Sequence, residues 1–196
     1  LELTVLHKNG EKIPVEAEVA VIDYNGSPST LAIIHHGAER KKLDEQLKEG
    51  LEKLKKSFGT LIEALNKVVE ARDPYTGGHQ RRVANLARAI AVELGLPNEE
   101  VDSLSLAAMV HDIGKIAVPS EILNKPGSLS QSEWGLVKNH AQIGYDLLKD
   151  VEFPWPVANI IYQHHERLDG SGYPLGLKAG EIRREARILA VADVVE

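Results

Sequence analysis

Residues 106–115, LAAMVHDIGK, predict the buried end of a helix followed by a polar cluster. The residues that share the buried face recur at spacings of three, four and three: Val101, Leu104, Ala108 and His111. We expect the helix to end at Gly114, so that Lys115 places a cation beside whatever anion binds there. Because a single His-Asp pair at a helix end is usually a buried hydrogen-bonded pair, this stretch alone does not define a site.

Five further side chains that can bind metals fall on predicted helices, each at a buried face or a helix end. They are His79, His140, His164, His165 and Asp193. A buried carboxylate such as Asp193 needs a partner to offset its desolvation, either a metal or, alternatively, Lys115 or an arginine. With His111 and Asp112 the set offers seven ligands, enough for two metals roughly 3.5–4 Å apart that Asp112 bridges. Iron or manganese fits these ligands best, and zinc and nickel are also compatible.

The composition limits the class of protein. The chain has 196 residues, a net charge of −6 and no cysteine. The negative charge disfavours binding to DNA or RNA. The lack of cysteine excludes disulfides and thiolate ligands, and it fits a reducing compartment, so we expect the cytoplasm. The sequence shows no apolar run of membrane-spanning length and no signal peptide, and its abrupt start suggests a piece of a longer protein.

Residues 1–37 follow a β pattern. Apolar residues alternate along one run: Ile13, Val15, Ala17, Val19 and Val21. Two Asn-Gly pairs, at 9–10 and 25–26, predict hairpin turns, so we expect a three-stranded antiparallel meander. The run 8–15 and the exit at 38–42 resemble the C-terminal half of a PAS sensor domain. That resemblance implies a partial sensor without most of its ligand pocket.

Residues 38–70 predict one long helix rich in Lys and Glu. Its apolar residues recur in alternating steps of four and three, as in the seam of a coiled coil: Leu47, Leu51, Leu54, Phe58, Leu61, Leu65 and Val68. The alternative is a single amphipathic helix that packs on its own domain, wholly or at its C-terminal end. The position between a sensor and an effector favours a signalling linker, so we expect a homodimer through this helix.

Residues 71–196 predict a helical domain. After a break at Pro74 and Gly77-Gly78, helices are expected from His79 to Leu94, from Pro97, from Ser130 or Ser132 through Leu147, from Val157 through His164, and from about Arg183. The glycines and proline of 169–176 predict a loop. The fold class is therefore a mainly α bundle, preceded by a small antiparallel β-meander and a long coiled-coil-like helix.

Four motifs resemble the HD-GYP domains, a branch of the HD superfamily of metal-dependent phosphohydrolases. They are ARDPYTGGH at 71–79, HDIGK at 111–115, KNHAQIG at 138–144 and HHERLDGSGYP at 164–174, completed by Asp193 in AVAD at 190–193. The resemblance implies an all-helical HD-domain bundle. It also implies a role in bacterial signal transduction, the hydrolysis of the second messenger cyclic di-GMP.

The same resemblance implies roles for the site residues. One metal would be held by His79, His111, Asp112 and Asp193, and the other by Asp112, His140, His164 and His165. Lys115 would contact the substrate phosphate, and the loop Gly172-Tyr173-Pro174 would border the site or contact other signalling domains. Some members hold a third metal with a Glu four residues before the first His. Here that position is Tyr75, so we expect two metals.

The leading hypothesis is in-line attack on a phosphodiester by a metal-bridging hydroxide, with Asp112 and Lys115 as the catalytic residues. The product would be linear pGpG, GMP or both. Two alternatives stay open. The first is a phosphohydrolase that acts on another cyclic dinucleotide or on a nucleotide, and the second is a catalytically silent binding module that signals through the long helix and the Gly172-Tyr173-Pro174 loop.

Overall fold

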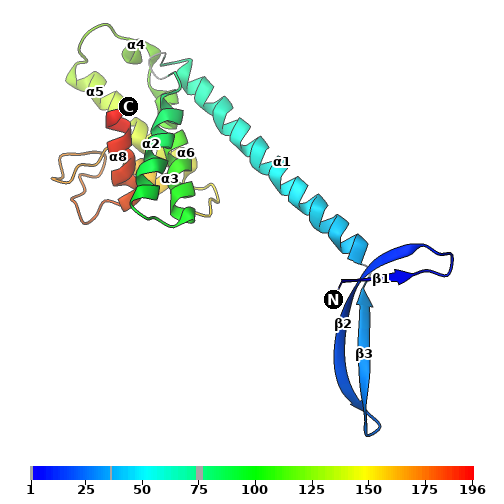
Figure 1. The fold of residues 1–196 in the computed structure, drawn as a ribbon. Helices are drawn as coiled ribbons and strands as arrows, with labels where there is room; N and C mark the ends of the chain where they lie inside the picture. The colour runs from blue at the N-terminus through cyan, green and yellow to red at the C-terminus, as the bar shows by residue number, and fades with distance from the viewer. Residues whose placement is uncertain (1, 36, 74–76) are drawn as a thin grey trace. The chain divides into compact units, whose positions relative to one another are not determined.

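The computed structural model describes residues 2–35, 37–73 and 77–196, and it divides the chain into two compact units, residues 1–59 and 60–196 (Figure 1). Tyr75, on which the expected number of metals depends, lies outside the described residues. Within the described ranges, no helix is long and apolar enough to cross a membrane.

The first unit begins with a small antiparallel sheet. Its strands are β1 (Glu2–Leu6), β2 (Lys12–Tyr24) and β3 (Ser27–His35). They lie in the order β1-β2-β3, with Val5 opposite Ile13 and Val19 opposite Ala32, which confirms the predicted meander. The partial PAS domain stays a prediction, because three-stranded sheets occur in many unrelated folds.

The helix α1 (Gly37–Glu70) confirms the long helix predicted from residue 38 to residue 70. Seven apolar residues from Leu47 to Val68 recur along α1 in alternating steps of four and three. We call these seven residues the α1 seam. They are between 45% and 73% exposed. At the C-terminal end of α1, Ile62 packs against the core of the second unit, and Val69 is 2% exposed. That end of the helix therefore packs on the following domain while the seam stays open.

Five helices in the described part of the second unit surround its core (Figure 1). They are α2 (His79–Glu93), α3 (Asn98–Val110), α6 (His140–Leu148), α7 (Val157–Tyr162) and α8 (Arg184–Val195). α3 packs against α2, α7 and α8, and α6 packs against α7. Fully buried aliphatic side chains fill the space between them: Val83, Leu104, Ile160, Ile161 and Leu189. Each stabilises the fold by roughly 1.5–3 kcal/mol, and the predicted mainly helical bundle is confirmed.

Two helices end earlier than predicted. α3 ends at Val110, and Gly114 lies instead inside a short 3₁₀ helix, η2 (Ile113–Ala117). α7 ends at Tyr162, so His164 lies in the turn beyond that helix. Carbonyl groups in the last turn of a helix lack intrahelical partners. In both helices the ring of the histidine that follows donates a hydrogen bond to one of these carbonyls, which explains the early ends.

The single helix predicted to follow Ser130 is two helices, α5 (Gln131–Lys138) and α6. Ser130 caps α5 in a capping box: its hydroxyl accepts the N–H of Glu133, and the Glu133 carboxylate accepts the N–H of Ser130. α6 then starts afresh at His140, whose ring donates to a carbonyl in the last turn of α5. The short helix α4 (Ser120–Leu123) lies between η2 and α5.

Candidate metal centre

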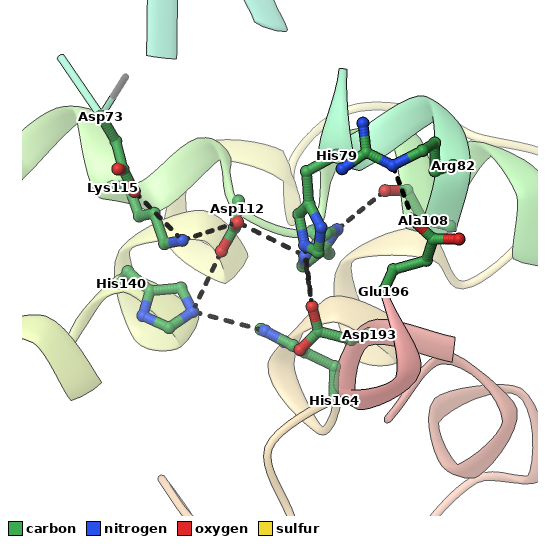
Figure 2. Close-up of polar contacts among 11 residues, drawn as sticks. Asp73, His79, Arg82, Ala108, Asp112, Lys115, His140, His164, Asp193 and Glu196 are labelled. Atoms are coloured by element: carbon green, nitrogen blue, oxygen red, sulfur yellow. Dashed lines mark hydrogen bonds and ion pairs between the residues drawn. The ribbon is translucent and has the colours of Figure 1, made fainter. Parts of the chain in front are cut away.

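The seven predicted ligands come together where several helices begin or end, and Figure 2 shows all of them except His165. His79 begins α2, His111 follows α3, Asp112 precedes η2, His140 begins α6, His164 and His165 follow α7, and Asp193 lies in α8. The widest separation in sequence is that of His79 and Asp193, 114 positions apart. Their Nε2 and Oδ1 atoms lie 3.0 Å from each other. Most of the set is buried, while the side chains of His79 and Asp193 are 16% exposed.

The position of Asp112 depends on close packing between η2 and α6. Gly114 lies directly against the backbone of α6, where a Cβ atom would be 1.9 Å from the carbonyl oxygen of His140. Any larger residue would push η2 away from α6, and Asp112 and Lys115 would move with it. Gly114, predicted to end a helix, therefore serves close packing beside the site.

Three histidines are oriented in the same way by the backbone. The Nδ1 atoms of His111, His140 and His164 each lie within hydrogen-bond distance of the carbonyl oxygen of the third residue before the ring, at 2.8 Å for His111 and 2.6 Å for His140. Because a carbonyl oxygen can only accept, Nδ1 carries the hydrogen and Nε2 keeps its lone pair. This is a tautomer that binds metals, held in place by a backbone contact.

The ligand atoms form three overlapping groups, and within each group all atoms lie within 4.8 Å of one another. The groups are His79 with His111 and Asp193; His111 with Asp112 and His164; and His140 with His164 and His165. Asp112 faces two of the histidines with different oxygens (Figure 2). Its Oδ2 lies 3.4 Å from Nε2 of His111, and its Oδ1 lies 3.6 Å from Nε2 of His140.

Two features of this cluster fit a cation. The Nε2 atoms of His140 and His164 lie 3.3 Å apart, and each bears a lone pair because Nδ1 of both rings donates to the backbone. Two lone pairs at this distance repel each other unless a proton or a metal ion lies between them. In addition, the buried Nε2 of His111 makes no hydrogen bond within the described part of the chain. The His/Asp clusters therefore fit a metal site.

Burial keeps three of the rings neutral. It lowers the pKa of His140, lowers that of His164 well below its usual value, and lowers the pKa of His165 to about 4. A neutral imidazole is the form that binds a metal. At neutral pH these three histidines are therefore ready to act as ligands without first losing a proton.

His111 and the two carboxylates behave differently. Burial alone would lower the pKa of His111, but the charges of Asp112 and Asp193 outweigh it and raise that pKa. Burial alone would raise the pKa of both carboxyl groups, yet His111 lowers both, helped by Lys115 at Asp112 and by His79 at Asp193. The carboxylates are therefore ionised at neutral pH.

Lys115 pairs with two acids. Its Nζ lies 2.8 Å from Oδ2 of Asp112 and 3.5 Å from Oδ2 of Asp73 (Figure 2). Burial disfavours the charge on Lys115, but Asp112 and then Asp73 outweigh burial and raise its pKa, so the ammonium is protonated. No pattern in the sequence indicated a role for Asp73. The feature that could have indicated this role is its position in the sequence, immediately after the long helix and at the break before α2.

The structure places Tyr173 beside the centre. Its ring centroid lies 4.7 Å from that of His165, with 32° between the ring planes, and Nζ of Lys138 lies 5.2 Å from the Tyr173 ring centroid. Gly172 and Pro174 flank Tyr173 in the chain. Glu166, which sequence reasoning also left without a role, is 3% exposed in this region. The feature of the sequence that could have indicated a role for Glu166 is its position between a histidine pair and a glycine-rich loop.

Several helix ends converge on a buried His/Asp cluster. This arrangement defines the class of protein as a helical domain whose clusters fit a metal site. A family model described as an HD domain matches residues 63–196. The chain is 40% identical over 156 residues to the cyclic di-GMP phosphodiesterase response regulator RpfG of Xanthomonas campestris, a match that covers 79% of this chain and 41% of that protein. It is 43% identical over 129 residues to the 3'3'-cGAMP-specific phosphodiesterase 1 of Vibrio cholerae, covering 66% of this chain and 30% of that protein.

The chain therefore belongs to the HD domain family, and its domain is of the HD-GYP type. Its fold is similar to that of Bd1817, an HDG"Y"P protein from Bdellovibrio bacteriovorus, with a TM-score of 0.53 and 19% identity; the match covers 89% of this chain and 80% of that chain. The chain spans less than half the length of the two curated relatives, 41% of one and 30% of the other.

Proposed function

We propose that the chain is a metal-dependent phosphodiesterase that hydrolyses cyclic di-GMP to pGpG, GMP or both. The observation that carries this proposal is the convergence of seven histidine and aspartate side chains in three groups of ligand atoms, each within 4.8 Å. The names of the two relatives, one acting on cyclic di-GMP and the other on 3'3'-cGAMP, support a cyclic dinucleotide as the substrate.

Two divalent ions, iron or manganese, would occupy the cluster. One would be held by His79, His111, Asp112 and Asp193, and the other by Asp112, His140, His164 and His165. The two oxygens of Asp112 face different histidines, which supports a bridging role. When bound, such ions lower the pKa of a water ligand and stabilise the charge that develops on the phosphodiester. The number two depends on Tyr75, which stands where some members carry the Glu for a third metal.

Lys115 would bind a phosphate oxygen of the substrate. Its raised pKa keeps the ammonium charged at neutral pH, and its distance of 2.8 Å from Asp112 places that charge at the edge of the ligand cluster. A preorganised cation at this position stabilises negative charge on a phosphate without further rearrangement. The loop Gly172-Tyr173-Pro174 would border the substrate, with the Tyr173 ring as a stacking surface for a guanine base.

Turnover of a panel of nucleotides tests this proposal. The purified chain, loaded with manganese or iron, would be assayed with cyclic di-GMP, 3'3'-cGAMP and pGpG. We expect the highest kcat/KM for cyclic di-GMP, with pGpG as its first product. A higher kcat/KM for 3'3'-cGAMP would favour that substrate, which the 43% identity to the Vibrio cholerae enzyme supports as the second candidate. Binding of cyclic di-GMP without any turnover would instead favour a silent signalling module.

We also propose that residues 1–37 are the C-terminal part of a PAS-like sensor domain, that residues 38–70 are a signalling linker, and that residues 71–196 are the HD-GYP domain. The α1 seam supports a homodimer through the linker. Near the C-terminal end of α1, Ile62 packs on the core of its own unit and Val69 is buried, whereas the seam residue Leu61 remains 64% exposed. The seam is therefore free to pair with the same seam of a second chain.

A further inference from the structure

Glu166 is a buried acid that binds a loop. It follows the His164-His165 pair and is 3% exposed. One carboxylate oxygen accepts the N–H of Leu175 at 2.6 Å and of Gly176 at 3.2 Å, and the other accepts the N–H of Leu177 at 2.9 Å. Three successive backbone donors thus converge on one carboxylate. Hydrogen bonds of this kind are stronger than neutral ones when the acceptor is charged.

The loop also contacts the backbone on either side of this acid. The N–H of Tyr173 donates to the carbonyl of His165 at 3.2 Å. Gly172 lies so close to the same segment that a Cβ atom would be 2.3 Å from the backbone nitrogen of Arg167. The loop is therefore held on this segment both before and after the Tyr173 side chain.

This attachment determines where the Tyr173 ring lies. The ring packs on His165, whose own ring centroid lies 5.0 Å from that of His140. Nζ of Lys138 approaches the Tyr173 ring. Together, Tyr173 and Lys138 present an aromatic face and a cation beside the ligand cluster. A nucleotide carries a base and a phosphate that match these two groups.

We propose that Glu166 is a positioning residue for substrate binding: it fixes the loop so that Tyr173, packed on His165, stacks on a base of the dinucleotide through the face over which Nζ of Lys138 lies, while Lys138 turns to a phosphate. This inference rests on the proposed phosphodiesterase function. Both oxygens of Glu166 are engaged by the loop backbone, so Glu166 acts through Tyr173 rather than on the substrate or a metal. Its loss should raise KM while kcat and metal content change little.

Glu166→Gln is the sharpest variant because it keeps the side-chain volume. Its amide NH₂ group would face a backbone N–H, so at least one of the three hydrogen bonds is lost. The matched control is Glu181→Gln. The exposed carboxylate of Glu181 accepts the N–H of Lys178 at 2.8 Å in the same region of the chain, away from Tyr173. We expect KM to rise roughly tenfold in Glu166→Gln and to stay unchanged in Glu181→Gln.

Hydrogen exchange measured on the whole chain tests the attachment without relying on turnover. The amides of Leu175, Gly176 and Leu177 should exchange about tenfold faster in Glu166→Gln, and at the original rate in the control. Unchanged exchange at these amides would overturn the proposal.

If Glu166→Gln shows no cooperative thermal transition, Glu166→Asp replaces it. This variant keeps the charge on a shorter side chain, and the amides should again exchange faster. A wild-type chain that does not hydrolyse cyclic di-GMP would refute the proposed function, while the exchange rates would still decide whether Glu166 holds the loop.

A double-mutant cycle separates positioning from general destabilisation. Tyr173→Ala should itself raise KM for cyclic di-GMP. Adding Glu166→Gln in that background should then change KM by less than about twofold, because the two residues act as one unit. If the two variants instead raise KM independently, so that their effects multiply, Glu166 does not act through Tyr173 and the proposal is wrong.

Discussion

The metal centre at the end of α3 buries histidines and carboxylates, whereas the middle of α1 exposes leucines and a phenylalanine. His111, Asp112 and His164 are between 1% and 3% exposed, while the α1 seam is between 45% and 73% exposed. Buried charges and exposed apolar surfaces both cost free energy when they have no partner. A cation would therefore stabilise the first region, and another apolar helix would stabilise the second.

The two regions differ in how narrowly they specify that partner. In the centre, backbone carbonyls set the tautomer of three rings, so the positions of the lone pairs are determined before any metal binds. The seam offers a repeat, which any helix with a matching repeat could cover. Substitutions of ligands in the centre should therefore abolish metal binding outright, whereas substitutions in the α1 seam should weaken helix pairing by degrees.

The largest effect is expected from Asp112→Ala. This change removes a carboxylate whose two oxygens face different histidines, so both metals should be lost and turnover of cyclic di-GMP should fall by roughly 10³-fold or more. Metal content per chain and turnover are the measurements. Asp146→Ala, at an exposed acid of α6 that contacts Lys149, is the control and should change neither. Retention of two metals in Asp112→Ala would contradict the assignment.

Lys115→Ala should separate charge stabilisation from metal binding within the same centre. Because an ammonium cannot ligate a metal, we expect unchanged metal content together with turnover lower by about 10²- to 10³-fold. Lys125→Ala, which removes an exposed lysine paired with Glu133, should leave turnover unchanged. Loss of metal or of the fold in Lys115→Ala would show that its pairing with Asp73 and Asp112 is structural.

The seam is tested by placing charges in it. Leu51→Lys combined with Leu54→Lys should convert a parallel dimer to a monomer, because each leucine buried in a dimer contributes roughly 1.5–3 kcal/mol. Sedimentation equilibrium measures the change, and the thermal unfolding of residues 60–196 should be unaffected. Glu49→Lys with Glu52→Lys adds two lysines outside the seam and should leave the dimer intact. A wild-type chain that is monomeric at tens of micromolar would refute the dimer.

The smallest expected effect is on the free energy of unfolding, and it is tested by comparing two adjacent valines of α1. Val69 is 2% exposed and Val68 is 51% exposed. In the monomeric double-lysine variant, Val69→Ala should lower the free energy of unfolding by about 1.5 kcal/mol, since it deletes two buried methyl groups. Val68→Ala should change it by less than about 0.5 kcal/mol. Urea denaturation measures both, and equal effects would mean that α1 packs on the core through another face.

Local patterns predicted most of the elements. The meander, the long helix, α2, the start of α3 and the last helix follow from apolar periodicity, Asn-Gly turns and breaks at proline and glycine, all of which act between neighbours in the chain. The helix ends near the site were wrong, because the rings of His111, His140 and His164 donate to backbone carbonyls and periodicity does not report such bonds. The roles of Asp73 and Glu166 were missed for a related reason. Their partners lie in other segments, and a single acid in a sequence does not show what it contacts.

The sequence by itself determined the fold class, the helical order and the residues able to bind metal, because side-chain chemistry and local spacing are written directly in the chain. Tertiary structure alone decided which of those residues meet. His79 and Asp193 come within 3.0 Å across 114 positions because α2 and α8 pack together. Gly114 brings η2 onto α6, and Glu166 holds the loop that carries Tyr173. These contacts depend on how whole helices and loops pack, which no local pattern encodes.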